Sequence, residues 1–544
     1  MSRSLSFRNL ARAIRIACYC EENNFSTSEG LERAVALEAQ AAARRASRRE
    51  FIANMGKLAV VGAIGSVVPP LRIGRAAPAP DPVVRVAIVG AGLAGLACAD
   101  ELNTNGIKAD LYEANNRVGG RCFSLDGFFP EQVAERGGEF IDNLHKAMIG
   151  YAKRFKLRLE DVEKAPGEVV YFFDGQRVPE SAVVEEFRDL VSAMRDDLRK
   201  VGQPTADSYT TADAALDYTN LREYLETRGA GPIASKAIEQ AYLAEYGLEI
   251  DQQSCLSFLL FIHADRRSKF RPFGVFSDER YHIIGGNDQI VKGLRKQLEG
   301  QIQLEMTLVK ARKKAGGIEI VFNNGSKTVS KTYDAVVFAI PFSTLREVEL
   351  DASLGLPAWK LSAIKELRYG TNAKMMIGFD GRPWLAHESN GTSYSDLTNH
   401  QTTWETNPTK ATDLRAVLTD YSGGNRGASL NPKQTQKEAT LFLNDLDRVY
   451  PGALAAASRI GGKLRVHLEH WPSNPFVKGS YTCNHPGYFT TIADNEAKPV
   501  GNMYFAGEHT SSFYEFQGFM EGAALSGIRA AREVLQNIKV GALP

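Results

Sequence analysis

The sequence predicts an α/β protein built from two interleaved domains, one of α/β type and one of α+β type. Two patterns near the ends of the chain indicate the first domain. A short β-branched run at 84–89 leads into a glycine-rich turn and a helix, and another strand followed by a helix occupies 503–538. The residues between them alternate between helical patterns and mixed strand and helix patterns. A length of 544 residues suits two or three domains of about 150 residues each.

Hydrophobic residues make up 44% of the chain and charged residues 24%, which is the balance of a globular protein with a large core. The formal net charge is +1, so no overall field favours nucleic acid. We therefore expect no nucleic-acid partner. Six cysteines are scattered without the histidines or paired spacing of a zinc site, so buried thiols are expected and no metal site is predicted.

Residues 1–82 have the features of a leader with an export signal and a linker. Two arginines in Ser47-Arg48-Arg49-Glu50-Phe51-Ile52 precede an apolar run, Leu58 to Val68, much shorter than the roughly 20 residues that span a bilayer. Ala77-Pro78-Ala79 offers a cleavage site. The pattern resembles a twin-arginine export signal, so we expect a periplasmic or extracellular protein outside the membrane. The alternative is an ordinary basic, amphipathic helix at the N-terminus.

The strand at 84–89 and the turn after it predict a dinucleotide-binding unit of the Rossmann type. Gly90 permits the tight turn, Gly92 lets the backbone approach a diphosphate, and Gly95 lets the helix pack closely on the strand. The diphosphate would lie on amide groups at the positive end of the helix, at Leu93 and Ala94. A lone Gly-x-Gly-x-x-Gly pattern is weak evidence, but this one has a strand before it and a helix after it.

Further segments suit the same cofactor. A second strand at 109–112 ends in Glu113, where a ribose hydroxyl needs an acceptor, and a late strand ends in Glu508, a candidate for a ribityl hydroxyl. Because both ends of the mature chain close the site, FAD is favoured over a nicotinamide that must leave. The predicted FAD-binding residues are Gly90, Gly92, Leu93, Ala94, Gly95, Glu113, Ala114, Arg117, Gly120, Arg121, Gly137, Gly138, Glu139, Phe140, Leu308, Gly507, Glu508, Gly518, Phe519 and Met520.

Three segments resemble the flavin amine oxidases, a family that includes monoamine, polyamine and L-amino-acid oxidases. They are residues 84–121, Gly285-Gly286-Asn287 before a helix, and residues 479–532. The family implies an FAD domain assembled from separated segments and a substrate domain with a six-stranded sheet and helices. On this basis the leader is 1–82, the FAD-binding segments are 83–150, 281–345 and 476–544, and the substrate-domain segments are 151–280 and 346–475.

Lys374 lies within an otherwise apolar strand at 373–379. A lone lysine in such a strand ordinarily extends its charge to solvent at a sheet edge. In the family, a lysine in this strand holds a water against the hydride-accepting nitrogen of the flavin, and the resemblance carries that catalytic role to Lys374. A fixed cation or water dipole there would help the ring accept electrons and react with dioxygen.

The resemblance also implies that Tyr481 and Phe519 are the paired aromatic rings that flank the amine. Such an apolar slot favours the neutral amine, whose lone pair is needed when a hydride leaves the adjacent carbon. The alternative is that both rings are ordinary core residues. Monoamine oxidases carry a flavin-linked cysteine at the position of Ser480, so non-covalent FAD is predicted here.

The substrate is less clearly indicated. In several L-amino-acid oxidases an arginine near the second flavin segment binds the substrate carboxylate, whereas this chain has Phe140 in that stretch. Glu515, Trp404 and Gln517 are predicted to bind the substrate, with the Glu515 carboxylate meeting a cationic group. Glu515 is equally compatible with a position facing solvent or a protein arginine.

We therefore predict oxidative deamination of a basic L-amino acid, arginine or lysine, to the 2-keto acid, ammonia and hydrogen peroxide, with dioxygen as electron acceptor. A polyamine or monoamine oxidase is the alternative within the class, because it needs no carboxylate anchor. A non-catalytic FAD-binding protein for electron transfer or docking is the alternative from another class. The oligomeric state stays open, with a homodimer as one arrangement.

Overall fold

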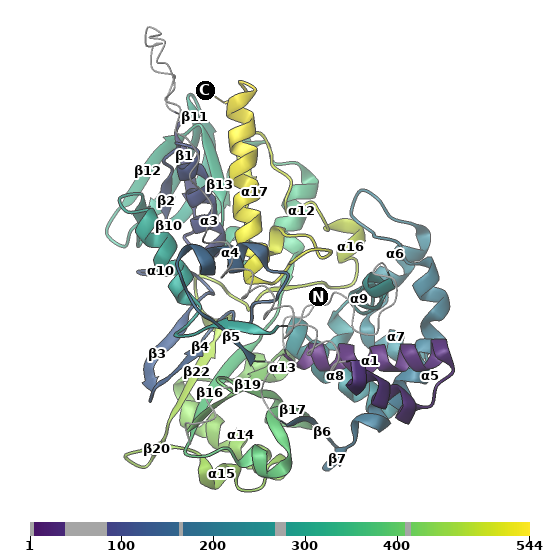
Figure 1. Ribbon diagram of the computed structural model, residues 1–544. Coiled ribbons are helices and arrows are strands. Elements are labelled where there is room, and N and C mark those ends of the chain that lie inside the picture. The colour runs from purple at the N-terminus through teal and green to yellow at the C-terminus, as the bar shows by residue number, and fades with distance from the viewer. Residues whose placement is uncertain (1–4, 38–83, 163–166, 267–278, 409–414, 544) are drawn as a thin grey trace, which may run out of the picture.

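The computed structural model describes residues 5–37, 84–162, 167–266, 279–408 and 415–543. Figure 1 shows three parts: a sheet with flanking helices that include the last helix, a second large sheet, and a group of helices beside it. The twin-arginine motif, the apolar run and the proposed cleavage site lie outside the described residues. In the part of the chain that is described, no helix is both long and apolar enough to cross a membrane.

The first part is a parallel sheet of five strands in the order β24-β13-β1-β2-β9. Strands β1 and β13, which are neighbours in this sheet, are apolar and completely buried, as central parallel strands usually are. The C-terminal strand β24 joins strands from the beginning and middle of the chain, as predicted for the dinucleotide-binding domain. The five strands are β1 (Val86–Val89), β2 (Asp110–Tyr112), β9 (Ile302–Gln303), β13 (Ala335–Phe338) and β24 (Met503–Phe505).

Helices α3 (Leu93–Thr104) and α17 (Met520–Lys539) lie side by side against this sheet (Figure 1). Gly527 makes this close contact possible, because an added Cβ would lie 2.0 Å from the carbonyl oxygen of Ala94. The shorter helices α4 (Lys146–Arg154) and α10 (Asp288–Gln297) contact α17 and α3 respectively. The N-terminal ends of α3 and α17 thereby reach the same cavity.

A smaller sheet in the order β12-β11-β10-β14 continues this part of the protein. Strand β14 pairs in parallel with β10, so the segment that was predicted to end at residue 345 contributes pairing beyond that point. The strands are β10 (Thr307–Lys314), β11 (Gly317–Asn323), β12 (Thr328–Tyr333) and β14 (Glu349–Leu350), and the helix α12 (Ala358–Glu366) follows them.

The second part is a mixed sheet in the order β22-β16-β19-β18-β17-β6-β7. β6 and β17 run parallel, and the other neighbours run antiparallel. The sheet has seven strands rather than the six implied by the family resemblance, because the β6–β7 hairpin adds a short edge strand. The strands are β6 (Glu168–Phe173), β7 (Gln176–Val178), β16 (Ala373–Phe379), β17 (Ser389–Leu397), β18 (His400–Glu405), β19 (Ala416–Ser422) and β22 (Val466–His470).

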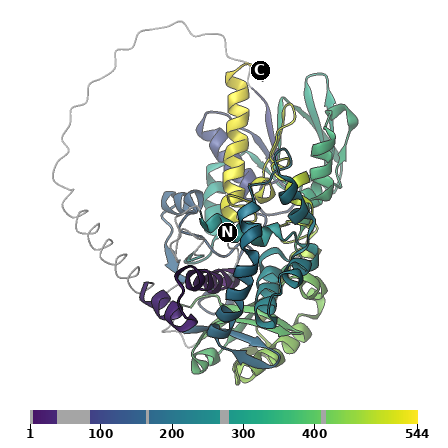
Figure 2. The same ribbon diagram turned by 90° about the vertical axis from the view of Figure 1, so that its right-hand side faces the viewer.

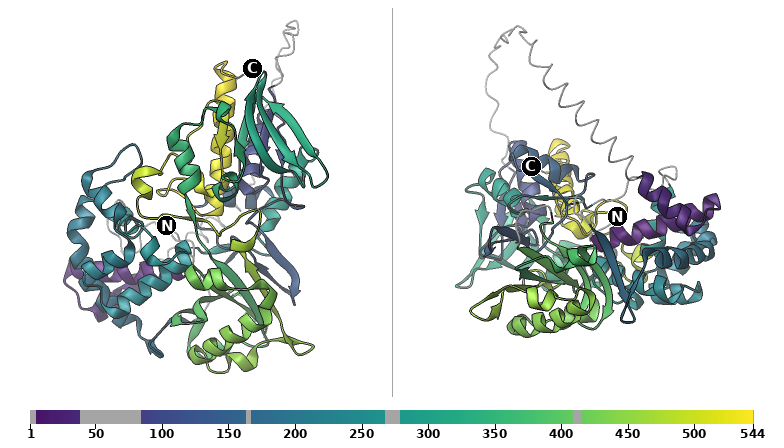
Figure 3. Two further views of the ribbon diagram at one scale, coloured as in Figure 1. Left: turned by 180° about the vertical axis from the view of Figure 1, so that it is seen from behind. Right: turned by 60° about the horizontal axis from the view of Figure 1, so that its bottom comes forward.

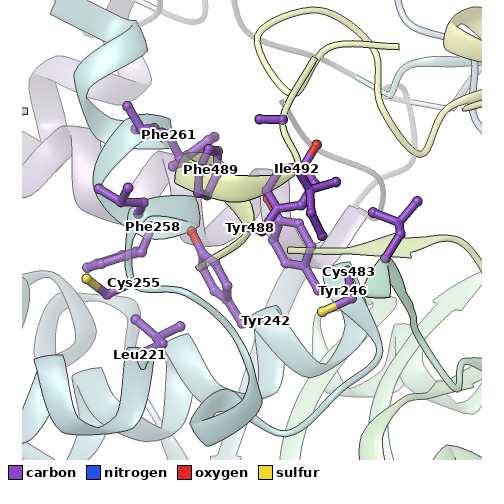
Figure 4. Close-up of a cluster of buried hydrophobic side chains, with 14 of the residues drawn as sticks. Leu221, Tyr242, Tyr246, Cys255, Phe258, Phe261, Cys483, Tyr488, Phe489 and Ile492 are labelled. Carbon is purple, nitrogen blue, oxygen red and sulfur yellow. The ribbon is translucent and has the colours of Figure 1, made fainter. Parts of the chain in front are cut away.

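The helices of the third part lie beside the large sheet, as the view from behind in Figure 3 shows. They are α5 (Glu180–Lys200), α6 (Thr211–Tyr218), α7 (Leu221–Thr227), α8 (Pro232–Tyr246) and α9 (Leu256–Arg266). A cluster of buried aromatic rings joins them to the C-terminal third of the chain (Figure 4). Tyr242 of α8 packs edge-on against Phe258 of α9, and Tyr488 and Phe489 of the short helix α16 (Tyr488–Thr491) enter the same cluster.

The N-terminal helix α1 (Leu5–Asn23) packs against α5 and α8 (Figure 2). Its apolar face is buried in the same core, with Leu10, Ile14 and Ile16 at most 3% exposed. At its polar edge, Arg188 of α5 donates to Glu21 at 2.8 Å. The expectation that the first 82 residues lie outside the fold therefore does not hold for residues 5–37.

Candidate active site

A cavity of about 430 Å³ connects the glycine-rich turn after β1 with the large sheet. The predicted catalytic residues Lys374, Tyr481 and Phe519 line it together with Trp404. Cofactor and substrate residues from distant parts of the chain are thus brought into one site. The predicted FAD-binding residues that line the cavity are Gly90, Gly92, Leu93, Ala94, Glu113, Ala114, Arg117, Gly120, Arg121, Gly137, Gly138, Glu139, Phe140, Leu308, Gly507, Glu508, Gly518, Phe519 and Met520.

The glycines of the first turn differ in what surrounds them. Gly90 has a φ of +103°, which glycine adopts without strain, and Gly92 has no protein atom within 4 Å of where a Cβ would lie. Gly95 is outside the cavity lining, and its added Cβ would lie 1.8 Å from the carbonyl oxygen of Gly90. Gly92 therefore leaves open space toward the cavity, while Gly95 permits the packing of α3 on β1.

Glu113 lies at the end of β2 with its carboxylate held in place by backbone amides. Oε2 accepts from the amide of Ala91 at 2.8 Å and Oε1 from that of Asn115 at 2.8 Å. Burial raises the pKa of this carboxyl, and the two amide donors oppose that rise. Each oxygen retains a lone pair with which a ribose hydroxyl could bond.

Arg121 lines the cavity and links three segments of the chain. Its Nη1 donates to Oε1 of Glu508 at 2.8 Å and to the carbonyl oxygen of Ser480 at 2.7 Å. Thr482 of β23 (Thr482–Cys483) donates to the other carboxylate oxygen of Glu508 at 3.0 Å. Arg117 is held by the carbonyl oxygen of Gly120 at 2.8 Å. Arg117 and Arg121 thus place two cations beside the turn that would bind a diphosphate.

These residues fit FAD. The N-terminal ends of α3 and α17 both reach the cavity and neither has a side-chain cap, so amide donors remain for an anion at each end. Gly92, Glu113 and Arg117 could hold the diphosphate and ribose, and the N-terminus of α17 could lie beside the isoalloxazine ring. FAD would supply acceptance of two electrons from a carbon next to an amine and their transfer to dioxygen.

Lys374 lines the same cavity and belongs to β16, a strand of the large sheet. Its Nζ donates to the carbonyl oxygens of Gly137 at 2.8 Å and Glu135 at 3.3 Å, and forms an ion pair with Oε2 of Glu139 at 2.7 Å. Its side chain is 6% exposed and that of Glu139 is 2% exposed. Lys374 is therefore buried at the junction of the two domains rather than extended to solvent at a sheet edge.

Aromatic side chains form the walls beside Lys374. The Trp404 ring packs edge-on against Phe140, with centroids 5.7 Å apart, and against Tyr421, with centroids 5.3 Å apart. Tyr481 donates from its hydroxyl to the carbonyl oxygen of Ala244 at 2.8 Å, and the Tyr421 hydroxyl lies 2.7 Å from that of Tyr481. These contacts make an apolar slot with hydroxyl groups at its edge, suited to a neutral amine.

Phe519, the second predicted slot residue, also lines the cavity, and its ring packs against His145 with centroids 5.2 Å apart. Burial lowers the pKa of His145 to about 4, so this imidazole is neutral near pH 7. Burial likewise lowers the pKa of His400 to about 3 and that of His509 well below its ordinary value. All three histidines are buried.

Two predicted substrate residues lie elsewhere. Glu515 is exposed and is outside the cavity lining, which matches the solvent-facing alternative. Gln517 is buried but also outside the lining, and its Nε2 donates to the Tyr488 hydroxyl at 2.7 Å. The structure thus removes Glu515 as support for a cationic substrate.

Ser480 contacts Asn372, donating from Oγ to Oδ1 at 2.6 Å. The thiol of Cys122 lines the cavity, but burial raises its pKa well above the ordinary value and keeps it protonated. All six cysteines lie within described segments, and no disulfide joins any two of them. Across the described segments, no group of three or more metal-ligand side chains is present.

Sequence reasoning missed several lining residues, of which Tyr421 and Glu279 are the most informative. Tyr421 lies directly opposite Lys374 in the β16–β19 register, a relation that no local motif encodes. Glu279 is 1% exposed and precedes β8 (Tyr281–Ile283), which pairs with β5 (Leu159–Asp161). Its position just after an arginine-rich stretch gave no signal of a buried carboxylate.

The fold and the site define a flavin-dependent oxidoreductase that acts on amines. The chain belongs to the flavin containing amine oxidoreductase family, whose model matches residues 93–535. A putative L-amino-acid oxidase, YobN of Bacillus subtilis (strain 168), is 25% identical over 476 residues, covering 82% of this chain and 94% of that protein. The L-amino-acid oxidase of Pseudechis australis is 25% identical over 479 residues, covering 83% and 86%.

Solved structures show the same fold. Cyclohexylamine oxidase from Brevibacterium oxydans IH-35A has a TM-score of 0.71 at 21% identity and covers 84% of this chain and 100% of its own. A putrescine oxidase bound to putrescine has a TM-score of 0.68 at 20% identity and covers 83% and 99%. The protein is therefore an FAD-dependent amine or L-amino-acid oxidase, and the alternative of a non-catalytic flavoprotein is not supported.

Proposed function

We propose that this enzyme oxidises a basic L-amino acid, arginine or lysine. The neutral α-amine enters the aromatic slot, and a hydride leaves the α-carbon for FAD. The resulting imino acid takes up water and releases ammonia to give the 2-keto acid. Dioxygen accepts the two electrons and is reduced to hydrogen peroxide.

The observation that carries this proposal is the buried carboxylate of Glu279 in the cavity lining. The residue after Glu279 is joined to the slot by a backbone hydrogen bond: the Arg280 carbonyl oxygen accepts from the amide of Val162 at 2.8 Å. Val162 packs in one cluster with Phe140 and Trp404. The ammonium or guanidinium of a basic substrate side chain that entered the cavity would be attracted to this carboxylate, because opposite charges interact strongly where water is excluded. Glu279 thus supports the role that the sequence had assigned to Glu515.

The L-amino-acid part of the proposal is supported by the relatives of that name. An α-carboxylate also needs a donor. The Tyr481 hydroxyl donates to the Ala244 carbonyl oxygen, and the indole N–H of Trp404 donates to Glu139. We therefore assign the carboxylate to the Tyr421 hydroxyl, which would turn from Tyr481 toward it, because an O–H donor bonds strongly to an ionised acceptor.

A diamine or polyamine is the second candidate. It would use the same carboxylate for its distal cation and would need no anchor for an α-carboxylate. The arginines of the described cavity lining, Arg117 and Arg121, both lie at the cofactor end, which favours this candidate. The two candidate substrates therefore differ only in whether they carry an α-carboxylate.

Matched substrate pairs test this difference. Arginine and agmatine differ only by the carboxylate, as do lysine and cadaverine. Under nitrogen, loss of the flavin's visible absorbance is followed after mixing with each compound, and peroxide is measured after air is admitted. We expect arginine and lysine to react faster; faster reaction of agmatine and cadaverine would replace the first candidate with the second.

Glu279→Gln tests the recognition of the side-chain cation. The substitution keeps the shape and removes the charge, so KM for arginine should rise by about tenfold or more, while KM for leucine should stay the same or fall. An equal rise for both amino acids would show that residue 279 acts on the pocket as a whole and would remove the support for a basic substrate.

We also propose that the protein is exported by the twin-arginine pathway. The motif at 47–52 and its pair of arginines support this proposal. Replacing Arg48 and Arg49 with lysine should retain the enzyme in the cytoplasm, as measured by peroxide production in cell fractions. Unchanged export of the double variant would contradict it. The oligomeric state is open and is to be measured by light scattering, with a homodimer as one arrangement.

A further inference from the structure

The Lys374 ammonium group directs all of its donors at one short segment. A lysine ammonium has three N–H donors. In this chain the three acceptors are the carbonyl oxygens of Glu135 and Gly137, at 3.3 and 2.8 Å, and Oε2 of Glu139, at 2.7 Å. Lys374 belongs to the large sheet, whereas residues 135–139 belong to the cofactor segment that follows β4 (Gln132–Glu135). The ammonium therefore ties the two domains together where the cavity turns from cofactor to substrate.

Glu139 completes this arrangement through its second oxygen. Oε1 accepts from the indole Nε1 of Trp404 at 3.0 Å, so one carboxylate holds both the ammonium and a wall of the slot. The backbone of the same segment is also held, because Asn287 donates to the carbonyl oxygen of Glu139 at 2.7 Å. Both charged side chains are almost completely buried, so each charge offsets the cost of burying the other.

We propose that Lys374 and Glu139 act as one electrically neutral positioning unit. The unit holds segment 137–140 against the flavin and holds Trp404 at the slot. This role differs from that of a lone cation directing a water toward the flavin, which the family resemblance implies for Lys374. Two observations carry the difference: the three occupied donors, and the opposite charge 2.7 Å away, which cancels most of the field of the ammonium at a distance.

The two roles predict different midpoint potentials for bound FAD. If the pair is neutral, Lys374→Met leaves a negative charge in the lining and lowers the potential, because added electrons are repelled. Glu139→Gln leaves a positive charge and raises the potential. The double variant carries neither charge, so its potential returns toward that of the wild type. A lone cation predicts no shift for Glu139→Gln and a double variant equal to Lys374→Met, and either of these results overturns the proposal.

The titrations are run under nitrogen with a reference dye, at one pH for the wild type and all variants, so that the midpoint potentials differ only through the charges that each substitution removes.

Lys360 offers a matched control. It is also a completely buried lysine, with Nζ donating to the carbonyl oxygens of Asn495 at 2.5 Å and Glu496 at 2.9 Å, but it is outside the cavity lining. Lys360→Met should lower the unfolding temperature and leave the potential unchanged. A shift as large as that of Lys374→Met would attribute the effect to general loosening of the core.

Reaction with dioxygen gives a second readout. The rate constant for reoxidation, measured in stopped flow, should stay within about threefold of the wild type in the double variant, since the charges are removed together. Removal of a group that directly stabilises developing charge typically costs about 100-fold or more. A loss of that size in the double variant would assign the lone-cation role to Lys374 and refute the neutral unit.

Discussion

The substitution Gly92→Ala tests how closely the cofactor approaches the backbone of the glycine-rich turn after β1. Gly92 precedes α3 with a φ of −67° and a ψ of −179°, an extended conformation open to any residue. An added Cβ would meet no protein atom within 4 Å. The apoprotein should therefore fold normally and gain a few tenths of a kcal/mol, about 0.4–1, from the less flexible unfolded chain.

Bound FAD changes this balance, because its diphosphate is expected where the Cβ would lie. Overpacking by one methyl group typically costs about 1–3 kcal/mol. Since about 1.4 kcal/mol is tenfold in affinity, the Kd for FAD should rise about 5- to 150-fold. Quenching of flavin fluorescence during titration of the apoprotein measures the Kd, and tryptophan emission on heating measures the stability of the apoprotein.

Two other glycines serve as controls. Gly150→Ala, in α4, adds a Cβ with no atom within 4 Å and lies outside the cavity lining, so it should leave the Kd unchanged. Gly95→Ala places a Cβ 1.8 Å from the carbonyl oxygen of Gly90 and should destabilise the apoprotein itself. Wild-type affinity in Gly92→Ala, or equal weakening in Gly150→Ala, would refute the placement of the diphosphate.

Four further outcomes are expected. Ile14→Ala, in the buried face of α1, should lower the free energy of unfolding by about 2–5 kcal/mol in urea, and an effect no larger than that of exposed Val35→Ala would show that α1 is not packed. Burial raises the pKa of Asp420 in β19 to about 7, so the folded protein binds this proton more tightly than the unfolded chain and loses stability as the pH rises from about 4 to 7. Asp420→Asn should flatten that loss in thermal unfolding across the range, and an unchanged slope would contradict the raised pKa. Phe519→Ala should reduce kcat/KM by about tenfold through loss of the slot wall, a value that steady-state peroxide assays give, and full activity would place the amine elsewhere. Denatured enzyme passed through a filter should release its FAD, since Ser480 replaces the linking cysteine; flavin retained with the chain would contradict this.

Much of the cofactor site was predictable because its signals are local. The strand, the turn of Gly90 and Gly92, and the helix after them are contiguous, and each residue type follows from the backbone conformation that it must adopt. Glu113 follows from its place at the end of the next strand. The position of the aromatic slot at Tyr481 and Phe519 came from the family resemblance, and the structure brings both to one cavity.

The substrate end could not be predicted in the same way. Glu515 lies in a loop next to the slot along the chain, yet its side chain is exposed, whereas Glu279 lies far away along the chain and lines the cavity. Burial depends on which segments pack together, and an acidic residue in a loop has the same local pattern in either place. The interaction of Lys374 with Glu139 likewise joins residues from two domains.

By itself, the sequence determined the class of fold and the dinucleotide-binding turn, because periodicity and glycine spacing are encoded over a few consecutive residues. The family followed from the resemblance of three segments to the flavin amine oxidases. Only the tertiary structure decided that α1 belongs to the core, that Tyr421 faces Lys374, and which carboxylates reach the cavity. These relations arise from strand register and helix packing, which depend on the free energy of the whole assembled core rather than on any one segment.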